Sequence, residues 1–219
     1  MNHPTTIERV VLSPRAAVLP QVVGCAESLA GDTGVVVRFA GLSLHALSRC
    51  LTEAEKAIVR KGLLGAGELP QPERSAVGYV CVGRRLSLDA QVCGGDAGAV
   101  GEGEVIAVSD HVNLTFRSPL RGPNDDSFGP RFPLMAGLYH PEIVKGGYPV
   151  GEETVAEVQD PDRVSVLERR ILERWGEVCA VTNELAAVAI LAAHAGLHLA
   201  VAMVMPGRDN TTTRRMTDV

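Results

Sequence analysis

Residues 109–139 read SDHVNLTFRSPLRGPNDDSFGPRFPLMAGLY, a stretch in which residues of restricted or unusual backbone geometry are concentrated. Pro123 and Pro130 fix φ and remove backbone donors, while Gly122 and Gly129 allow conformations that other residues avoid. A helix or strand cannot follow such a path. Ordered long loops in compact domains are usually functional, so this stretch is predicted to be a shaped loop that takes part in function.

The sequence on either side of this loop alternates between strand and helix patterns. Thr52 and Glu55 have the capping-box spacing, which predicts a helix over residues 52–64. Residues 162–175 carry apolar side chains every three or four positions, which predicts a helix with one apolar face formed by Val164, Leu167, Ile171 and Trp175. A further helix is predicted over residues 184–195. Apolar runs predict strands over residues 34–40, 76–82, 104–108, 177–182 and 197–205, and the first of these is expected in the centre of the sheet.

Residues 24–31 (GCAESLAG) follow a short apolar run and are bounded by glycines, so they are predicted to form a turn after a strand. The overall alternation predicts an α/β fold with three layers, in which a mostly parallel central sheet is flanked by helices on both faces. Ligands bind such sheets at the carboxyl ends of the strands. Residues 1–219 are expected to form a single domain, because no linker or internal repeat divides them.

Composition excludes several classes of function. The net charge of −5 argues against a nucleic-acid partner, which would need clustered Lys and Arg, and favours small-molecule chemistry. The N-terminus lacks the pattern of a secretion signal, and no apolar run reaches the roughly 20 residues of a membrane span. A cytoplasmic protein is therefore expected. No His, Cys and carboxylate grouping has metal-ligand spacing, so no metal is expected.

The words DHVNL and GPNDDSFGPRFP resemble the trimeric purine nucleoside phosphorylase family. This resemblance implies a mixed central sheet wrapped by helices and a trimeric assembly. It also implies that Phe128 reaches across the trimer contact to cover the ribose of a neighbour, with plain interface packing as the alternative. His111 and Asn113 are expected to be satisfied structural groups. The family's C-terminal helices are expected to be absent.

Glu153 opens the segment ETVAE, residues 153–157, which is similar to the family segment whose Glu addresses the purine base. The resemblance makes Glu153 the candidate catalytic residue at the base. The family has a phenylalanine before this Glu, where Glu152 stands here. The alternative interpretation is a solvated acidic turn.

Residues 180–197 (AVTNELAAVAILAAHAGL) are similar to the family's strand, turn and helix that end in His-x-Gly-Leu. Asn183 stands at the family's methionine and is a candidate for substrate binding. Glu184 stands at a phosphate-touching serine, and the turn resembles nucleosidases of the wider superfamily in which a Glu grips ribose hydroxyls. Glu184 is thus the second candidate catalytic residue, and the alternative is that Asn183 or Glu184 caps the following Ala-rich helix.

The candidate residues for binding phosphate and the far side of the base rest on weaker resemblance. Ser28 lies in the turn at the place of the family's glycine-rich phosphate loop, and Arg84 lies in a Gly-Arg-Arg segment that resembles a phosphate-binding strand end. Arg38 is a rival for Arg84, and either could be a plain surface arginine. Asp209 is the candidate to replace a family Asn at the purine.

Three functions stay open. The first is a pentosyltransferase or nucleosidase that cleaves or transfers at the N-glycosidic bond of a purine-type nucleoside, with no cofactor and with inorganic phosphate open as a co-substrate. The second is a catalytically degenerate subunit that partners an active homologue. The third is a repurposed biosynthetic enzyme acting on a non-nucleoside substrate in the same cleft. The expected assembly is a homotrimer or a hetero-oligomer with a homologue, without nucleic acid or membrane.

Overall fold

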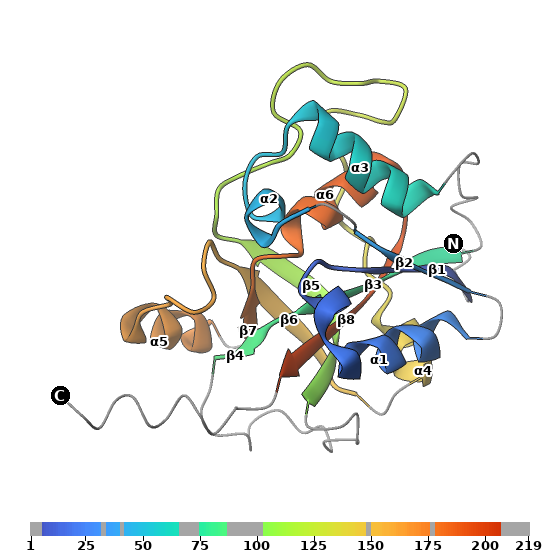
Figure 1. Cartoon of the computed structure of the whole chain (residues 1–219). Coiled ribbons are helices and arrows are strands. Elements are labelled where there is room, and N and C mark those ends of the chain that lie inside the picture. The colour runs from blue at the N-terminus through green and yellow to red at the C-terminus, as the bar shows by residue number, and fades with distance from the viewer. Residues whose placement is uncertain are drawn as a thin grey trace.

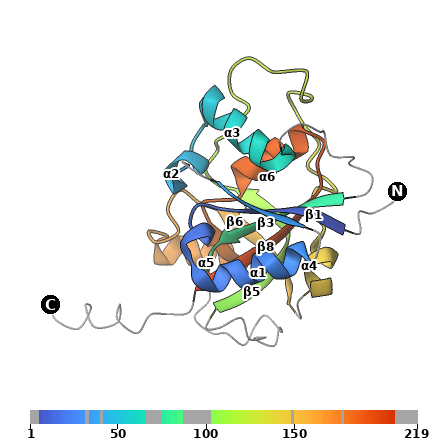
Figure 2. The same cartoon turned by 45° about the vertical axis from the view of Figure 1, so that its right-hand side comes forward.

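A computed structural model describes residues 6–31, 34–39, 42–65, 75–86, 103–147, 150–175 and 178–206. A central sheet lies between two groups of helices, with one further helix to the side (Figure 1). Turning the molecule shows the same three layers (Figure 2). The predicted fold class, α/β with a mixed and mostly parallel central sheet flanked by helices, is confirmed.

Eight strands form the sheet in the order β2-β1-β3-β8-β5-β6-β7-β4. Their bounds are β1 Thr6–Leu12, β2 Val35–Arg38, β3 Ser75–Val82, β4 Arg84–Arg85, β5 Gly103–Asn113, β6 Glu152–Glu157, β7 Val178–Thr182 and β8 Leu199–Pro206. Five neighbouring pairs are parallel, whereas β5 runs antiparallel to β8 and β4 antiparallel to β7.

The helices cover both faces of the sheet. Their bounds are η1 Ala16–Val18, α1 Pro20–Ala30, α2 Leu44–Leu47, α3 Glu53–Leu64, α4 Pro141–Gly147, α5 Val166–Arg174 and α6 Ala186–His194. Helices α1 and α4 lie on one face, and α2, α3 and α6 lie on the other (Figures 1 and 2). Neighbouring positions of β1 show how the strands supply both cores, because Val10 and Leu12 pack towards α1 while Val11 packs on the opposite face.

At Gly83 the chain passes directly from strand β3, inside the sheet, to β4 at its edge, so these two parts of the sheet meet. This residue alone separates β3 from β4, yet β4 lies at the far edge of the sheet beside β7. A Cβ on Gly83 would lie 3.1 Å from the Val181 carbonyl oxygen and would overlap the Met203 side chain. Glycine therefore lets β7, β8 and the end of β3 approach closely, and this closure brings residues from distant parts of the chain together.

The loop predicted from residues 109–139 is irregular from residue 114 onwards, after a strand that continues to Asn113. It is ordered by the helices beneath it. The Lys56 ammonium donates to the Arg121 carbonyl at 2.9 Å, and the Arg60 guanidinium lies 4.5 Å from the centre of the Phe128 ring. The His194 Nε2 lies 3.3 Å from Asn124 Oδ1.

Several predicted elements are confirmed. Helix α3 begins at the Thr52–Glu55 capping box, and β3, β7, α6 and β8 lie where the sequence predicted them to within two residues. Helix α5 begins later than predicted, at a second capping box formed by Ser165 and Glu168.

Three predictions are wrong. Residues 24–31 belong largely to helix α1 and not to a turn, because Val22, Cys25, Ala26 and Leu29 are spaced to bury one helical face. Strand β2 forms the edge of the sheet and is not central. The predicted apolar face of α5 is also not buried, since Leu167 is 66% and Trp175 54% exposed, while Leu172 makes the contact with the core.

Among the described residues, no helix combines the length and hydropathy that a membrane span requires.

Candidate functional site

Glu184 is fully buried, and three donors converge on its carboxylate. The Ser13 hydroxyl donates to Oε2 at 2.8 Å, the Val82 amide donates to Oε2 at 3.1 Å, and the Arg15 amide donates to Oε1 at 3.2 Å. Ser13 itself is oriented because its Oγ accepts from the Ala16 amide at 3.1 Å. We call the three donors the Glu184 seat. They come from the ends of β1 and β3, where an α/β sheet places its ligands.

The backbone of Glu184 is held as firmly as its side chain. The Tyr79 hydroxyl donates to the Glu184 carbonyl at 2.6 Å, and the Glu184 amide donates to Thr182 Oγ1 at 3.3 Å. Burial raises the pKa of the Glu184 carboxyl, whereas the hydrogen bonds from Ser13, Val82 and Arg15 and the Arg15 charge act in the opposite direction. Helix capping, the alternative weighed from the sequence, is not its role, because its carboxylate bonds to other strand ends.

Glu153 lies at the start of β6 with its side chain only 10% exposed and paired with Arg85. Arg85 Nη2 lies 2.9 Å from Glu153 Oε1, and Arg85 Nε lies 2.8 Å from Glu104 Oε2. Burial opposes the charge of Arg85, but the hydrogen bonds to Glu104 and Glu153 outweigh it and raise the pKa of the guanidinium. The alternative of a solvated acidic turn is therefore wrong for Glu153, although its neighbour Glu152 is exposed.

The two predicted catalytic carboxylates border the same short segment. Residues 82–85, which we call the β3–β4 junction, touch Glu184 through the Val82 amide and Glu153 through the Arg85 side chain. Asn183 lies next to Glu184 and is 9% exposed, and its Oδ1 has no hydrogen-bond partner among the described residues. A buried acceptor without a partner is costly, which marks Asn183 as a group that a ligand could satisfy.

Sequence reasoning missed Glu157, the last residue of β6. Its carboxylate is buried and Oε2 accepts from the amides of Leu185 at 3.0 Å and Ala186 at 3.3 Å. Burial raises the pKa of Glu157 to about 8, the two backbone hydrogen bonds lower it, and the Glu184 charge raises it further. It is therefore Glu157 that caps the start of α6.

Ser13 and Arg15 were also missed. The available signal was a hydroxyl directly after the apolar run of residues 10–12, at the carboxyl end of a strand. Ser28, proposed from the sequence instead, is exposed on α1, because the segment is a helix and not a loop after a strand. No contact described in the structure joins Ser28 to Glu153 or Glu184.

For Arg84 and Phe128, the structure shows no contact with the carboxylates of Glu153 or Glu184. Arg84 is half-exposed and forms an ion pair with Asp162. Phe128 is partly exposed in the loop and stacks under Arg60 of its own chain, and its reach into a neighbouring subunit stays a prediction. Asp209 lies outside the described residues. His111 and Asn113 are satisfied as expected, since His111 Nδ1 bonds the Tyr139 hydroxyl and Asn113 closes the turn at residues 113–117.

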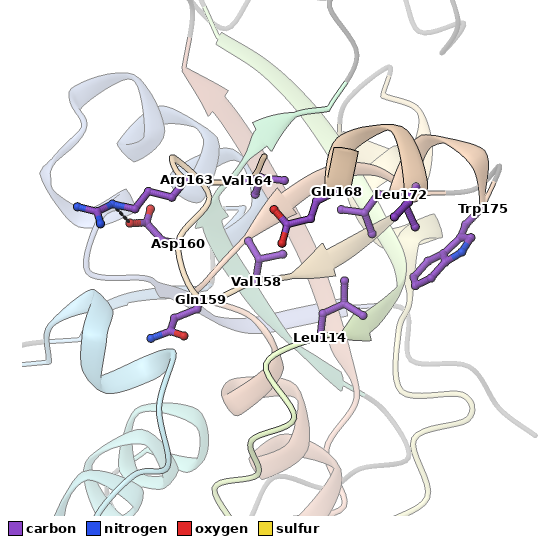
Figure 3. Close-up of a pocket in the computed structure, with 10 residues that line it drawn as sticks. Leu114, Val158, Gln159, Asp160, Arg163, Val164, Glu168, Leu172 and Trp175 are labelled. Carbon is purple, nitrogen blue, oxygen red and sulfur yellow. Dashed lines mark ion pairs between the residues drawn. The ribbon is translucent and has the colours of Figure 1, made fainter. Parts of the chain in front are cut away.

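A cavity of about 550 Å³ lies beside α5 and contains none of the predicted site residues. Aliphatic side chains line its middle, the Asp160–Arg163 ion pair lies at one end and Trp175 at the other (Figure 3). Leu114 and Val158 contribute from just beyond the carboxyl ends of β5 and β6. The helical periodicity of residues 162–175 was the only sequence signal, and it indicated burial in the core.

In the part of the chain that the structure describes, no three His, Cys, Asp or Glu side chains are grouped as metal ligands.

Replacing Tyr79 with phenylalanine is expected to lower the free energy of unfolding by about 1–2 kcal/mol, because the Glu184 carbonyl loses a buried hydrogen bond. Urea denaturation measures this change. Unchanged stability would show that the Tyr79 hydroxyl does not hold the Glu184 backbone.

Comparison with known proteins agrees with the resemblance found in the sequence. Purine nucleoside phosphorylase from Mus musculus is 32% identical over 110 residues, which is 44% of this chain and 38% of that protein. The Bos taurus enzyme is 30% identical over 137 residues, which is 55% of this chain and 47% of that protein. The chain thus spans about half or less of the length of these curated relatives.

A crystal structure of isoform 2 of purine nucleoside phosphorylase from Schistosoma mansoni, in complex with cytosine and ribose-1-phosphate, has a similar fold. The TM-score is 0.58, the sequence identity is 15%, and the match covers 97% of this chain and 81% of that chain. The family model of the phosphorylase superfamily matches residues 89–217, which is more than half of the sequence. The chain therefore belongs to the phosphorylase superfamily.

Proposed function

We propose that this protein binds a nucleoside-type ligand next to the β3–β4 junction and cleaves or transfers at its N-glycosidic bond. The observation that carries the proposal is that Glu153 and Glu184, 31 residues apart in sequence, both contact residues 82–85. Membership of the phosphorylase superfamily supports it. Purine preference, the trimeric assembly and a role of Phe128 at a neighbour's ribose belong to the same proposal.

Glu153 is assigned to the leaving base in this proposal, because the Arg85 guanidinium fixes the direction of its carboxylate. Asn183 offers an unpaired buried acceptor to a sugar hydroxyl. Glu184 contributes carboxyl oxygens near the strand ends, which favour positive charge that develops on a sugar as the bond to the base breaks.

A second candidate function is that of a catalytically degenerate subunit that partners an active homologue. A specific observation favours it, since Glu184 has no exposed surface and Glu153 is engaged by Arg85. Both carboxylates then serve the fold, while the loop of residues 114–139 is kept for contact with another subunit.

The test is incubation of the purified protein with inosine, guanosine and adenosine, with free base measured by chromatography. We expect base release, and we expect Glu153→Gln to reduce its rate by about 100-fold or more, because an amide oxygen accepts hydrogen bonds from the N–H groups of the leaving base more weakly than a carboxylate does. Glu152→Gln is the matched control, since Glu152 is adjacent but exposed, and its ion pair among the described residues is with Lys145 at 3.3 Å.

Equal rates in the wild type and Glu153→Gln would contradict the role of Glu153. Absence of release from every nucleoside, together with co-purification of a full-length homologue, would favour the degenerate subunit. A co-purified metabolite that is not a nucleoside would instead favour a repurposed biosynthetic enzyme.

A further inference from the structure

The donors around Glu184 have the composition of an anion-binding site. One hydroxyl and two backbone amides converge from two segments of the chain, with Ser13 and Arg15 after β1 and Val82 at the end of β3. The charge of Arg15 acts favourably on the same carboxylate. Converging backbone amides and hydroxyls with a nearby cation are the groups with which proteins hold small oxyanions such as phosphate and sulfate.

The oxygens of one internal side chain already occupy these donors. Glu184 Oε2 receives two of the hydrogen bonds and Oε1 receives the third. Ser13, Val82 and Glu184 have 0% of their surface exposed, so the Ser13 hydroxyl and the Val82 amide are not offered to solvent or to free ions. A carboxylate presents its oxygens to donors much as two oxygens of a phosphate would.

The internal carboxylate is also prevented from leaving. Tyr79 and Thr182 hold the Glu184 backbone on both sides of its Cα, at 2.6 Å and 3.3 Å. If the side chain moved out, three donors would lose their partner at once, and two of them, the Ser13 hydroxyl and the Val82 amide, are buried, where an unsatisfied donor is costly.

We propose that the Glu184 seat is a site for a small oxyanion that is permanently occupied by the chain's own carboxylate, so that inorganic phosphate cannot bind there. The consequence for the reaction rests on the proposed function. Water, and not phosphate, then accepts the sugar: the C1′–N bond breaks, the water oxygen bonds to C1′, one water proton is lost, and the base nitrogen gains a proton.

The experiment compares thermal unfolding in sodium phosphate and in sodium chloride at equal ionic strength and pH. The wild type is expected to show the same midpoint in both salts. Glu184→Ala empties the seat, and its midpoint is expected to rise with phosphate concentration, by about 5 °C at saturation, because phosphate binds only the folded form.

Two matched variants isolate the seat. Glu184→Gln keeps the side-chain shape and is expected to stay insensitive to phosphate. Removing a donor in the double variant Ser13→Ala with Glu184→Ala is expected to weaken the phosphate response by about 10-fold in concentration. Glu173→Ala, on the exposed side of α5, is the control for general salt effects.

If Glu184→Ala does not fold in chloride, equilibrium dialysis of the wild type with radiolabelled phosphate decides the question. Less than about 0.1 phosphate per chain at 10 mM supports the proposal, since a seated anion would bind near 1:1. Binding near 1:1 that Ser13→Ala abolishes overturns it, as does a phosphate response of Glu184→Ala no larger than that of the wild type.

Nucleoside assays with and without phosphate separate this inference from the proposed function. Base release that does not depend on phosphate supports both. Release that requires phosphate overturns the inference and leaves the proposed function standing. No release, together with phosphate binding by Glu184→Ala but not by the wild type, overturns the proposed function and supports the inference.

Discussion

Gly129→Ala is expected to lower the free energy of unfolding by about 3 kcal/mol and to release the loop of residues 114–139 from helix α6. A Cβ at this position would overlap the carbonyl oxygen of His194. That oxygen belongs to the backbone at the end of α6, so it cannot move aside as a flexible side chain would. The loop must therefore shift, and it would lose the contact between Asn124 and His194.

Urea denaturation measures the change in stability, and limited proteolysis reports release of the loop. Gly24→Ala is the matched control, because its Cβ meets no atom within 4 Å and the residue lies inside α1. That control is expected to stabilise the protein by up to about 1 kcal/mol through helix propensity. The loop would be shown not to dock on α6 in solution if Gly129→Ala had the same free energy of unfolding as the wild type. The same conclusion would follow if Gly129→Ala and Gly24→Ala lowered the free energy of unfolding equally.

Glu157 is expected to make the protein less stable as pH rises from about 4.5 to about 8. Burial raises its pKa from the ordinary 4.5 to about 8 in the folded state. Between these two values the unfolded chain has lost the proton while the folded chain keeps it, so folding takes up a proton. Stability therefore falls by about 1.4 kcal/mol for each unit of rising pH in this window, and the titration has no further effect above pH 8 or below pH 4.5.

Glu157→Gln removes this titration and keeps a carbonyl oxygen to accept from the Leu185 and Ala186 amides. Unfolding free energies are measured in urea at pH 5, 6, 7 and 8. The difference between the variant and the wild type is expected to increase in favour of the variant at each step of rising pH. Glu173→Gln is the control, at an exposed position of α5. Its unfolding free energy is expected to change with pH in the same way as that of the wild type. If the unfolding free energies of Glu157→Gln and the wild type changed with pH in the same way, the Glu157 carboxyl would be ionised in the folded protein.

Predictions from the sequence succeeded where the determining residues are close together. The Thr52 side chain and Glu55 lie three positions apart, and their capping box sets the start of α3 as predicted. The prolines and glycines of residues 114–139 act on their own φ angles, so the irregular path of that loop could be inferred from the sequence.

The wrong predictions share one physical cause. Gly24 and Ser28 are turn-forming residues when considered locally, but burial of Val22, Cys25 and Leu29 against the sheet determines a helix there. Burial against a distant surface outweighs local propensity, which amounts to only about 1 kcal/mol even for glycine. The position of β2 at the sheet edge likewise depends on pairing between segments that the local pattern does not contain.

By itself, the sequence determined the α/β class, the shaped loop and the superfamily resemblance, and it put forward Glu153 and Glu184 as candidate carboxylates. Only the tertiary structure decided what those carboxylates touch. The partners of Glu184 lie 171 residues away at Ser13 and 102 residues away at Val82, and closure of the sheet at Gly83 brings them together. Contacts over such separations depend on how whole strands pair, and strand pairing is a property of the packed sheet that no single segment encodes.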